Sequence, residues 1–313
     1  MAEKAIIPGG SGFLGRALAR DLAAAGWEVV ILSRRPAPAD GAIRTMVWDG
    51  RTSGAWAAEL EGAGAIINFT GRSVACIHNE RNRREIMDSR VDSVRAIDAA
   101  LAACAQPPPV WVQATSLAIY GNPGDRVCDE AAPEAGGFSA AVCRTWERNL
   151  LSGKGGFEKT RRVALRIGIV LGPKGGGLAP LARLARWYLG GSAGNGRQYI
   201  SWVHLDDFCA ICRWMIERKE AMGSYNATGP NPAPNAEFMR DVRRALGQPW
   251  CPPAPAWVVR LGARYLMHVE ADLALTGRRC VPGRLSAEGF EFKHPDLAPA
   301  LRDILGPKAQ KKV

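Results

Sequence analysis

The sequence has no long apolar run and no recognisable export signal. Its most apolar stretch, residues 110–120, is interrupted by Gln113, Thr115 and Ser116, whereas a membrane-spanning helix needs about 18 or more predominantly apolar residues. At the N-terminus, the apolar residues 5–7 run directly into glycines, and a secretory signal has a longer apolar segment. We therefore expect a cytoplasmic protein with no membrane partner.

Clustered metal ligands and a disulfide framework are also lacking. The eight cysteines are scattered through 313 residues, unlike those of small disulfide-rich domains. Cys209 and Cys212 have CxxC spacing but lie in an apolar run, and no second Cys or His pair has zinc-site spacing. His204 precedes Asp206 and Asp207, a pattern typical of a helix N-terminus. We predict packing for the cysteine pair, capping for the histidine, and no metal.

Charge of one sign is in excess, but it is not concentrated. Lys and Arg number 41 against 30 Asp and Glu, a formal net charge of +11, which favours an anionic partner such as nucleic acid, an acidic surface or a phosphorylated small molecule. The basic residues are mostly arginines in small groups, with no aromatic-interleaved basic stripe. DNA-reading motifs are absent as well. We therefore predict a small-molecule partner and no nucleic acid.

A glycine-rich turn between two apolar segments is the first positive signal. Residues 4–7 form a β-branched run, residues 16–25 have a helical pattern, and residues 28–32 resemble a second strand. Glycines in such a turn let a pyrophosphate approach the backbone, and the helix N-terminus attracts phosphate charge. A glycine loop without a ligand is the alternative, and no Gly-Lys-Ser/Thr follows for a nucleotide triphosphatase. The predicted phosphate-binding residues are Gly9, Gly10, Ser11, Gly12, Phe13, Leu14 and Gly15.

The end of the second predicted strand indicates which dinucleotide binds. NAD-binding proteins place an Asp or Glu there to accept hydrogen bonds from the adenine ribose, but this chain has Ser33, Arg34 and Arg35. A guanidinium binds a 2′-phosphate through two charge-assisted hydrogen bonds, and a carboxylate would repel it. We predict NADP(H) as the cofactor; the alternative is that both arginines are solvated surface charges.

Strand and helix patterns continue to alternate along the chain. Residues 65–69 and 110–115 are apolar strand candidates that flank a long helical pattern at 80–104. This alternation predicts an α/β fold with a Rossmann-like, doubly wound parallel sheet. From Gly172 onward the composition shifts to glycine-rich and proline-rich segments. We expect residues 1–171, joined by parts of 200–230, to form the NADP-binding Rossmann domain, and residues 172–313 a smaller C-terminal substrate-binding lobe.

The motifs together resemble the short-chain dehydrogenase/reductase superfamily, in its atypical extended, epimerase-family branch of NADP-dependent oxidoreductases. The resemblance covers nearly the whole chain and includes the epimerase-type C-terminal domain. It rests on Gly-Gly-x-Gly-x-x-Gly at 9–15, Ser-Arg-Arg at 33–35, Asn-Phe-Thr-Gly at 68–71, Asp-Ser-Arg-Val at 88–91, Thr-Ser at 115–116, Tyr-Gly at 120–121, Cys-Arg-Thr-Trp-Glu at 143–147, and the segments 166–172, 201–207 and 225–227.

The resemblance also implies further cofactor contacts. In this branch the turn after the third strand flanks the adenosine side, a valine lies near the nicotinamide, and a Glu and an Arg of the long helix contact the cofactor. Ordinary members of the superfamily have an Asn where this chain has the Arg. The corresponding residues are Phe69, Thr70, Gly71, Val170, Glu85 and Arg90.

The departure from the superfamily concerns catalysis. Ordinary members move a proton through the tyrosine of a Tyr-x-x-x-Lys motif, but that motif is absent from all 313 residues. Aligning the family's helix on residues 138–150 puts Ser139 at the tyrosine position and Cys143 at the lysine position. The remaining candidate proton donors are Thr115 or Ser116, Tyr120 in the next loop, and Cys143, with packing roles as the alternative for the last two.

Three functions remain open. The first is an NADP(H)-dependent oxidoreductase that transfers a hydride to or from a small carbonyl or alcohol. The missing Tyr and Lys motivate the second, a catalytically impaired, NADP(H)-responsive regulator or scaffold. A nucleotide-sugar epimerase or dehydratase ranks last, because its chemistry relies on the tyrosine that this chain lacks. The expected partner is a small-molecule substrate that the sequence does not identify, and a homodimer is a possible assembly.

Overall fold

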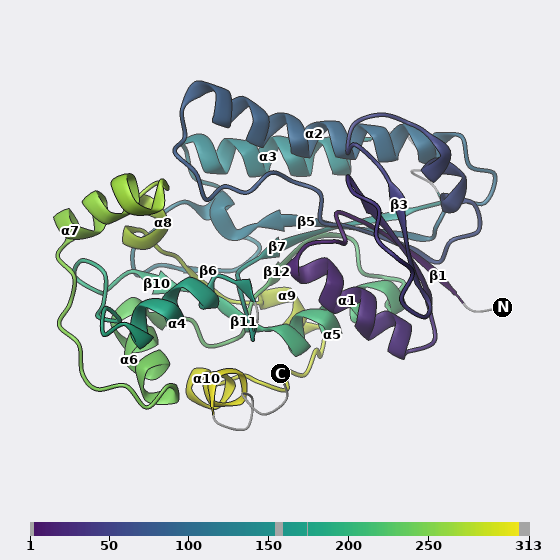
Figure 1. Ribbon diagram of the computed structural model, residues 1–313. Coiled ribbons are helices and arrows are strands. Elements are labelled where there is room, and N and C mark those ends of the chain that lie inside the picture. Colours follow the sequence, from purple (N-terminus) through teal and green to yellow (C-terminus); the bar gives the residue numbers. More distant parts are fainter. Residues whose placement is uncertain (1–2, 154–158, 174, 307–313) are drawn as a thin grey trace.

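A seven-stranded parallel sheet forms the centre of the molecule (Figure 1). The protein is seen in a computed structural model that describes residues 3–153, 159–173 and 175–306. The strands are β1 (Lys4–Pro8), β2 (Glu28–Ser33), β3 (Ile43–Val47), β4 (Ala65–Asn68), β5 (Val110–Ser116), β7 (Arg161–Ile167) and β12 (Gly223–Ala227). They lie in the order β12-β7-β5-β4-β1-β2-β3, with every neighbouring pair parallel. The predicted doubly wound sheet is confirmed.

Helices cover both faces of this sheet. On one face, α1 (Phe13–Ala24) packs beside α5 (Leu205–Glu217); on the other, α2 (Glu80–Ala102) packs beside α3 (Phe138–Leu151) and the 3₁₀ helix η1 (Ala55–Leu60) (Figure 1). Alternate strand residues point to opposite faces, so Ile7 contributes to the first core and Ile6 to the second. Burial on both faces explains why the strands near the centre of the sheet are mostly apolar.

The predicted elements of the first 150 residues are present, with small shifts at their ends. The first helix begins at Phe13, three residues before its apolar pattern starts, because the glycine turn leads directly into it. Strand β3, which was not predicted from the sequence, is an edge strand that is only partly buried. An edge strand with one neighbour does not need an apolar pattern on both faces, so it left no clear periodicity in the sequence.

The smaller lobe has its own hydrophobic core. It is built around α4 (Leu178–Arg186), α6 (Asn235–Ala245) and α10 (Leu297–Leu305), whose apolar faces meet.

The remaining elements of the chain are short. They are β6 (Val127–Cys128), η2 (Leu117–Tyr120), β8 (Ile169–Gly172), β9 (Gly175–Gly176), β10 (Tyr199–Ile200), β11 (Trp202–His204), β13 (Ala233–Pro234), α7 (Ala256–Leu261), the π-helix η3 (Gly262–Met267), α8 (Asp272–Leu275), β14 (Arg279–Cys280) and α9 (Gly283–Ala287). Between α4 and α6, the chain returns to the central sheet to add α5 and β12.

Two local predictions on α5 are confirmed. Cys209 and Cys212 lie on the buried side of the helix, in the core shared with α1. His204 is the N-cap, and its Nδ1 accepts a hydrogen bond from the backbone N–H of Asp206 at 3.1 Å. Within the ranges that the structure describes, no helix is both long and apolar enough to cross a membrane.

Candidate functional site

The glycine-rich turn lies at the carboxyl end of β1, beside the end of β4. The winding of the sheet reverses between these two strands, and such a switch point is where doubly wound folds bind ligands. Gly9 has a φ of +72°, and a Cβ on it would come within 2.8 Å of the backbone of Phe69 and Thr70. A Cβ on Gly15 would come within 2.4 Å of Gly10. The close approach of α1 and β4 to the turn therefore requires glycine at both positions.

The N-terminus of α1 is open toward this switch point. Gly12 is the N-cap and offers no side-chain acceptor, and the first turn contains no acidic residue. Arg16, one turn later, donates from Nε to the carbonyl of Ser11 at 2.6 Å and adds positive charge beside the turn. Free N–H groups at a helix N-terminus attract phosphate, so this end of the helix suits a pyrophosphate.

The side chain of Phe13 has a packing role in this turn. Its ring lies against a second glycine turn, where a Cβ on Gly175 would come within 2.5 Å and one on Gly172 within 2.7 Å of ring atoms. Val170, the predicted nicotinamide neighbour, is buried in β8 just before that turn. The predicted contacts of both residues with the cofactor stay predictions.

The end of β2 presents two exposed arginines next to the turn. Ser33 Oγ donates a hydrogen bond to Ser11 Oγ at 3.0 Å and joins the strand end to the glycine turn. Arg34 and Arg35 follow with exposed side chains, and neither forms an ion pair with any carboxylate of the described residues. Both guanidiniums are therefore free to take a phosphate.

The side-chain amide of Asn68, which is buried, stabilises the turn after β4 through hydrogen bonds. Asn68 donates from Nδ2 to Gln113 Oε1 at 2.9 Å, and its Oδ1 accepts the backbone N–H of Thr70 at 2.9 Å. The hydroxyl of Thr70 is buried but has no hydrogen-bond partner in the described part of the chain. An unsatisfied buried hydroxyl is costly, so this atom fits a site completed by a bound polar group.

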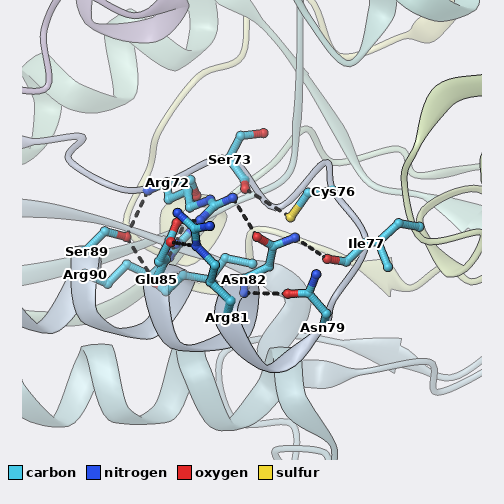
Figure 2. Close-up of polar contacts among 11 residues, drawn as sticks. Arg72, Ser73, Cys76, Ile77, Asn79, Arg81, Asn82, Glu85, Ser89 and Arg90 are labelled. Atoms are coloured by element: carbon cyan, nitrogen blue, oxygen red, sulfur yellow. Dashed lines mark hydrogen bonds and ion pairs between the residues drawn. The ribbon is translucent and has the colours of Figure 1, made fainter.

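Glu85 and Arg90 lie beside this turn, on the first half of α2 (Figure 2). The carboxylate of Glu85 forms ion pairs with Arg72 and with Arg81. Arg90 donates from Nη1 to the carbonyls of Arg72 at 3.1 Å and Ile86 at 2.9 Å. A Cβ on Gly71 would come within 3.4 Å of the Arg90 guanidinium carbon. The structure thus brings these residues to the predicted adenosine-side turn.

The structure separates the roles of Thr115 and Ser116 at the end of β5. Thr115 is 4% exposed and donates its hydroxyl hydrogen to Glu147 Oε1 at 3.0 Å. Ser116 is half-buried, and its Oγ accepts the N–H of Ala118 at 3.2 Å, which leaves the hydroxyl hydrogen available. Of the two, Ser116 is the residue that can donate to a substrate at the strand end.

Tyr120 belongs to a buried polar network. It is 1% exposed, its hydroxyl donates to Asn226 Oδ1 at 2.9 Å, and the same oxygen accepts from Arg166 Nη1 at 2.8 Å. Burial raises the pKa of this tyrosine to about 12, against the lowering effect of Arg166. The hydroxyl proton of Tyr120 is thus bonded to another residue of the protein. This arrangement agrees with a packing role for Tyr120, the alternative to proton donation.

Glu147 and Arg166 form the centre of that network. Arg166 Nη2 donates to Glu147 Oε2 at 2.8 Å and Nε to Oε1 at 2.9 Å, and both side chains are buried. Ser224 in β12 also donates to Glu147, at 3.1 Å. The sequence motifs contained both residues, but no local pattern indicated that they pair, because they come from α3 and β7.

Cys143 lies one turn after Ser139 on α3. The thiol is 4% exposed, and burial raises its pKa to about 11, with Glu147 contributing in the same direction. A thiol that stays protonated is a poor nucleophile. Ser139, at the expected tyrosine position, is exposed to solvent. Neither residue reproduces the acid of the Tyr-x-x-x-Lys motif.

A separate His and Asp cluster lies where the lobe meets α5. Within the described ranges, His204, His294 and Asp303 are the one group of potential metal ligands whose donor atoms come within 4.8 Å of one another. The two imidazoles stack with ring centroids 3.8 Å apart and planes 28° apart, so their lone pairs do not converge on one point. Nδ1 of His204 accepts an N–H, which leaves its ring proton on Nε2. This geometry does not fit a metal site.

The fold and the open glycine turn define a Rossmann-type, dinucleotide-binding protein. Residues 5–228 match the model of the NAD dependent epimerase/dehydratase family, and residues 254–304 match a domain of unknown function, DUF1731. The chain belongs to the NAD dependent epimerase/dehydratase family, which confirms the resemblance seen in the sequence.

Similar proteins cover nearly the whole chain. It is 32% identical to the mouse epimerase family protein SDR39U1, over 96% of this chain and 99% of that protein. Identity to the epimerase family protein YfhF of Bacillus subtilis is 29%, over 96% and 97% of the two chains. The crystal structure of human SDR39U1 with NADPH superposes with a TM-score of 0.85 at 31% identity, covering 96% of this chain and 99% of that one.

Replacing the buried carboxylate should destabilise the protein strongly. In a Glu147→Gln variant, Arg166 keeps its charge but loses its ion-pair partner inside the protein. Breaking a buried pair in this way costs about 3–5 kcal/mol of unfolding free energy. Asp125→Asn is the matched control, because the Arg197–Asp125 pair is exposed and such pairs contribute about 0–1 kcal/mol. Urea unfolding followed by circular dichroism gives both values, and equal losses would contradict the prediction.

Stability should also fall in alkaline solution. Burial raises the pKa of Cys143 to about 11 and those of Cys209 and Cys280 to about 12. A thiol in an unfolded chain has a pKa of about 8.5. As the pH rises above about 9, the unfolded state loses these protons and the folded state keeps them, so unfolding becomes more favourable. The Tm measured by calorimetry should decline from that pH upward, and less steeply for Cys143→Ala. A constant Tm up to about pH 10.5 would contradict this.

Proposed function

We propose that the protein binds NADP(H) at the switch point and transfers a hydride between the nicotinamide and a small carbonyl or alcohol substrate. The observation that carries the cofactor choice is the pair of exposed arginines at the end of β2, which form no ion pair among the described residues and stand where an NAD-binding protein has a carboxylate. The NADPH in the crystal structure of human SDR39U1 supports the same choice.

The residues present fit this cofactor. The glycine turn and the N-terminus of α1 would hold the pyrophosphate, Ser33, Arg34 and Arg35 would hold the 2′-phosphate, and the unsatisfied hydroxyl of Thr70 would contact the adenosine side. When bound, the nicotinamide supplies or accepts the hydride. Ser116, with its free hydroxyl hydrogen at the end of β5, orients and polarises the substrate carbonyl by donating a hydrogen bond.

A second candidate function is an NADP(H)-responsive regulator or scaffold. The observation that favours it is the way the chain holds its other candidate acids: the Tyr120 hydroxyl is bonded within the protein, and the Cys143 thiol is buried. Such a protein would bind NADPH without turnover. A panel of carbonyl and alcohol substrates, followed through NADPH absorbance, distinguishes the two functions.

The cofactor proposal predicts a selective loss of NADPH affinity in Arg34→Ala. Fluorescence titration of the nucleotide-free protein should show NADPH binding at least about tenfold tighter than NADH, a difference of about 1.4 kcal/mol. Removing the guanidinium should abolish most of that difference and leave NADH binding unchanged. Arg20→Ala is the control, because Arg20 is an exposed arginine of α1 one turn beyond the phosphate turn. Equal affinities in the wild type, or equal effects of both variants, would overturn the proposal.

A further inference from the structure

Three arginines are buried in the part of the chain that the structure describes, and one of them has no carboxylate partner there. Arg162, Arg166 and Arg243 are 4%, 7% and 8% exposed. Arg162 forms an ion pair with Asp98 at 2.6 Å, and Arg166 forms one with Glu147 at 2.8 Å. No carboxylate of the described residues lies within ion-pair distance of Arg243. Arginines are rarely buried without a partner, so Arg243 differs from the other two.

Hydrogen bonds satisfy only part of the Arg243 guanidinium. Its Nη1 donates to the carbonyl of Gly190 at 2.5 Å, whereas Nε and Nη2 have no acceptor among the described residues. Neither nitrogen belongs to the fully buried atoms without a partner, so both keep some accessible surface. The last turn of α6, where Arg243 lies, favours a cation through its backbone carbonyls. It supplies no acceptor for these two nitrogens, which remain available to a ligand.

Arg243 lines a cavity of about 640 Å³ in the smaller lobe, which we call the α6 cavity. Ala236, Arg240 and Arg243 contribute one wall, and their spacing of four and three residues puts them on one face of the helix. The other walls come from Ser192 and from the segment around Trp250. In Figure 1, α6 lies at the opposite end of the molecule from β1. A cavity of this volume suits a small organic ligand.

Hydrogen bonds that do not involve Arg243 hold the walls of the α6 cavity together. The backbone N–H of Ala193 donates to Oδ1 of Asn235, the first residue of α6, at 2.8 Å. The N–H of Ala254 donates to the carbonyl of Ser192 at 2.8 Å. These bonds connect the loop before β10 both to α6 and to the segment after it. The shape of the cavity is therefore set independently of the Arg243 guanidinium.

The other charged side chains near this cavity compensate one another. Arg240 pairs with Glu237 at 3.2 Å and with Asp241 at 2.9 Å. The exposed Arg244 also approaches the Asp241 carboxylate, at 3.7 Å. Two carboxylates thus offset the two neighbouring guanidiniums, and the charge of Arg243 is left over. An anion that enters the α6 cavity would meet a net positive charge.

The rim of the α6 cavity also offers a flat apolar surface. Trp250 is 75% exposed and lines the cavity, together with Pro234 and Pro253. An aromatic ring packs well against an indole ring, and burying such a surface is favourable. A ligand that has both an anionic group and a flat ring would therefore use both features of the cavity.

We propose that the α6 cavity binds a small organic anion in which a flat apolar ring carries a carboxylate or a phosphate group. Nε and Nη2 of Arg243 lie along one edge of the planar guanidinium, so they donate in parallel to two oxygens of the anion. The ring of the ligand packs against Trp250. This site does not rest on the proposed function, because it shares no residue with the predicted cofactor contacts.

The test is isothermal calorimetry of the whole protein at constant ionic strength, with benzoate as the carboxylate probe and phenyl phosphate as the phosphate probe. Benzamide removes the charge, and acetate removes the ring. We expect at least one ring-bearing anion to bind with a Kd of about 1 mM or tighter, and both controls to bind more weakly. Arg243→Gln should weaken binding at least about tenfold. Arg244→Gln, which removes the same charge from an exposed neighbour, should leave it unchanged.

A second variant tests the aromatic part of the site and does not depend on the folding of Arg243→Gln. Trp250→Ala removes a largely exposed side chain, so the protein should stay folded while benzoate binds several-fold more weakly. In nitrogen-15 NMR spectra, the indole signal that is missing from Trp250→Ala belongs to Trp250. That signal should shift when benzoate is added to the wild type.

Four outcomes would overturn the site. These are no saturable binding of either ring-bearing anion, wild-type affinity in Arg243→Gln, equal weakening in Arg244→Gln, and wild-type benzoate affinity in Trp250→Ala. The fate of the cofactor proposal is separate. Arg34→Ala and saturating NADPH should both leave benzoate binding unchanged, and displacement of benzoate by NADPH would place the probe in the cofactor site and reject the α6 cavity. Benzoate binding without NADPH binding would leave this site standing and reject the proposed function.

Discussion

The buried ion pair between Glu147 and Arg166 organises the end of the sheet where chemistry would take place. It joins α3 to β7, and hydrogen bonds from Thr115 and Ser224 attach β5 and β12 to the same carboxylate. Arg166 in turn holds the hydroxyl of Tyr120. Because an unpaired charge at this depth is strongly unfavourable, the four elements are held in one arrangement. This constraint decides which hydroxyls remain free at the strand ends.

The loss of the Tyr-x-x-x-Lys motif takes on a physical meaning in this arrangement. The helix position that carries the lysine in related enzymes has Cys143 in this chain, and burial raises the pKa of its thiol to about 11. The absent lysine therefore leaves a buried, protonated thiol one turn after Ser139, the position of the tyrosine in related enzymes.

The parts of the fold and site that the sequence predicted are those decided within one element or one turn. The glycine turn, the arginines after β2, the buried cysteines of α5 and the His204 cap are each marked by a sequence pattern that spans only a few positions. The choice between Thr115 and Ser116, the confinement of Tyr120 and the position of Arg278 depend on distant contacts. Tyr120 meets Asn226, 106 positions later, and Arg278 meets Gly121 across 157 positions. No local pattern carries such information.

The late return of the chain to the sheet has a consequence for how the protein is made. Strand β12 pairs with β7 over residues 163–167, but it is synthesised only after α4 and the first lobe strands. Until then, β7 is an open edge with unpaired backbone groups, which are prone to pair with another chain. The outer edge of β7 must therefore wait, during translation, for residues that follow the first part of the lobe. An isolated piece that ends at residue 171 would lack β12 and leave that edge of β7 without its partner strand.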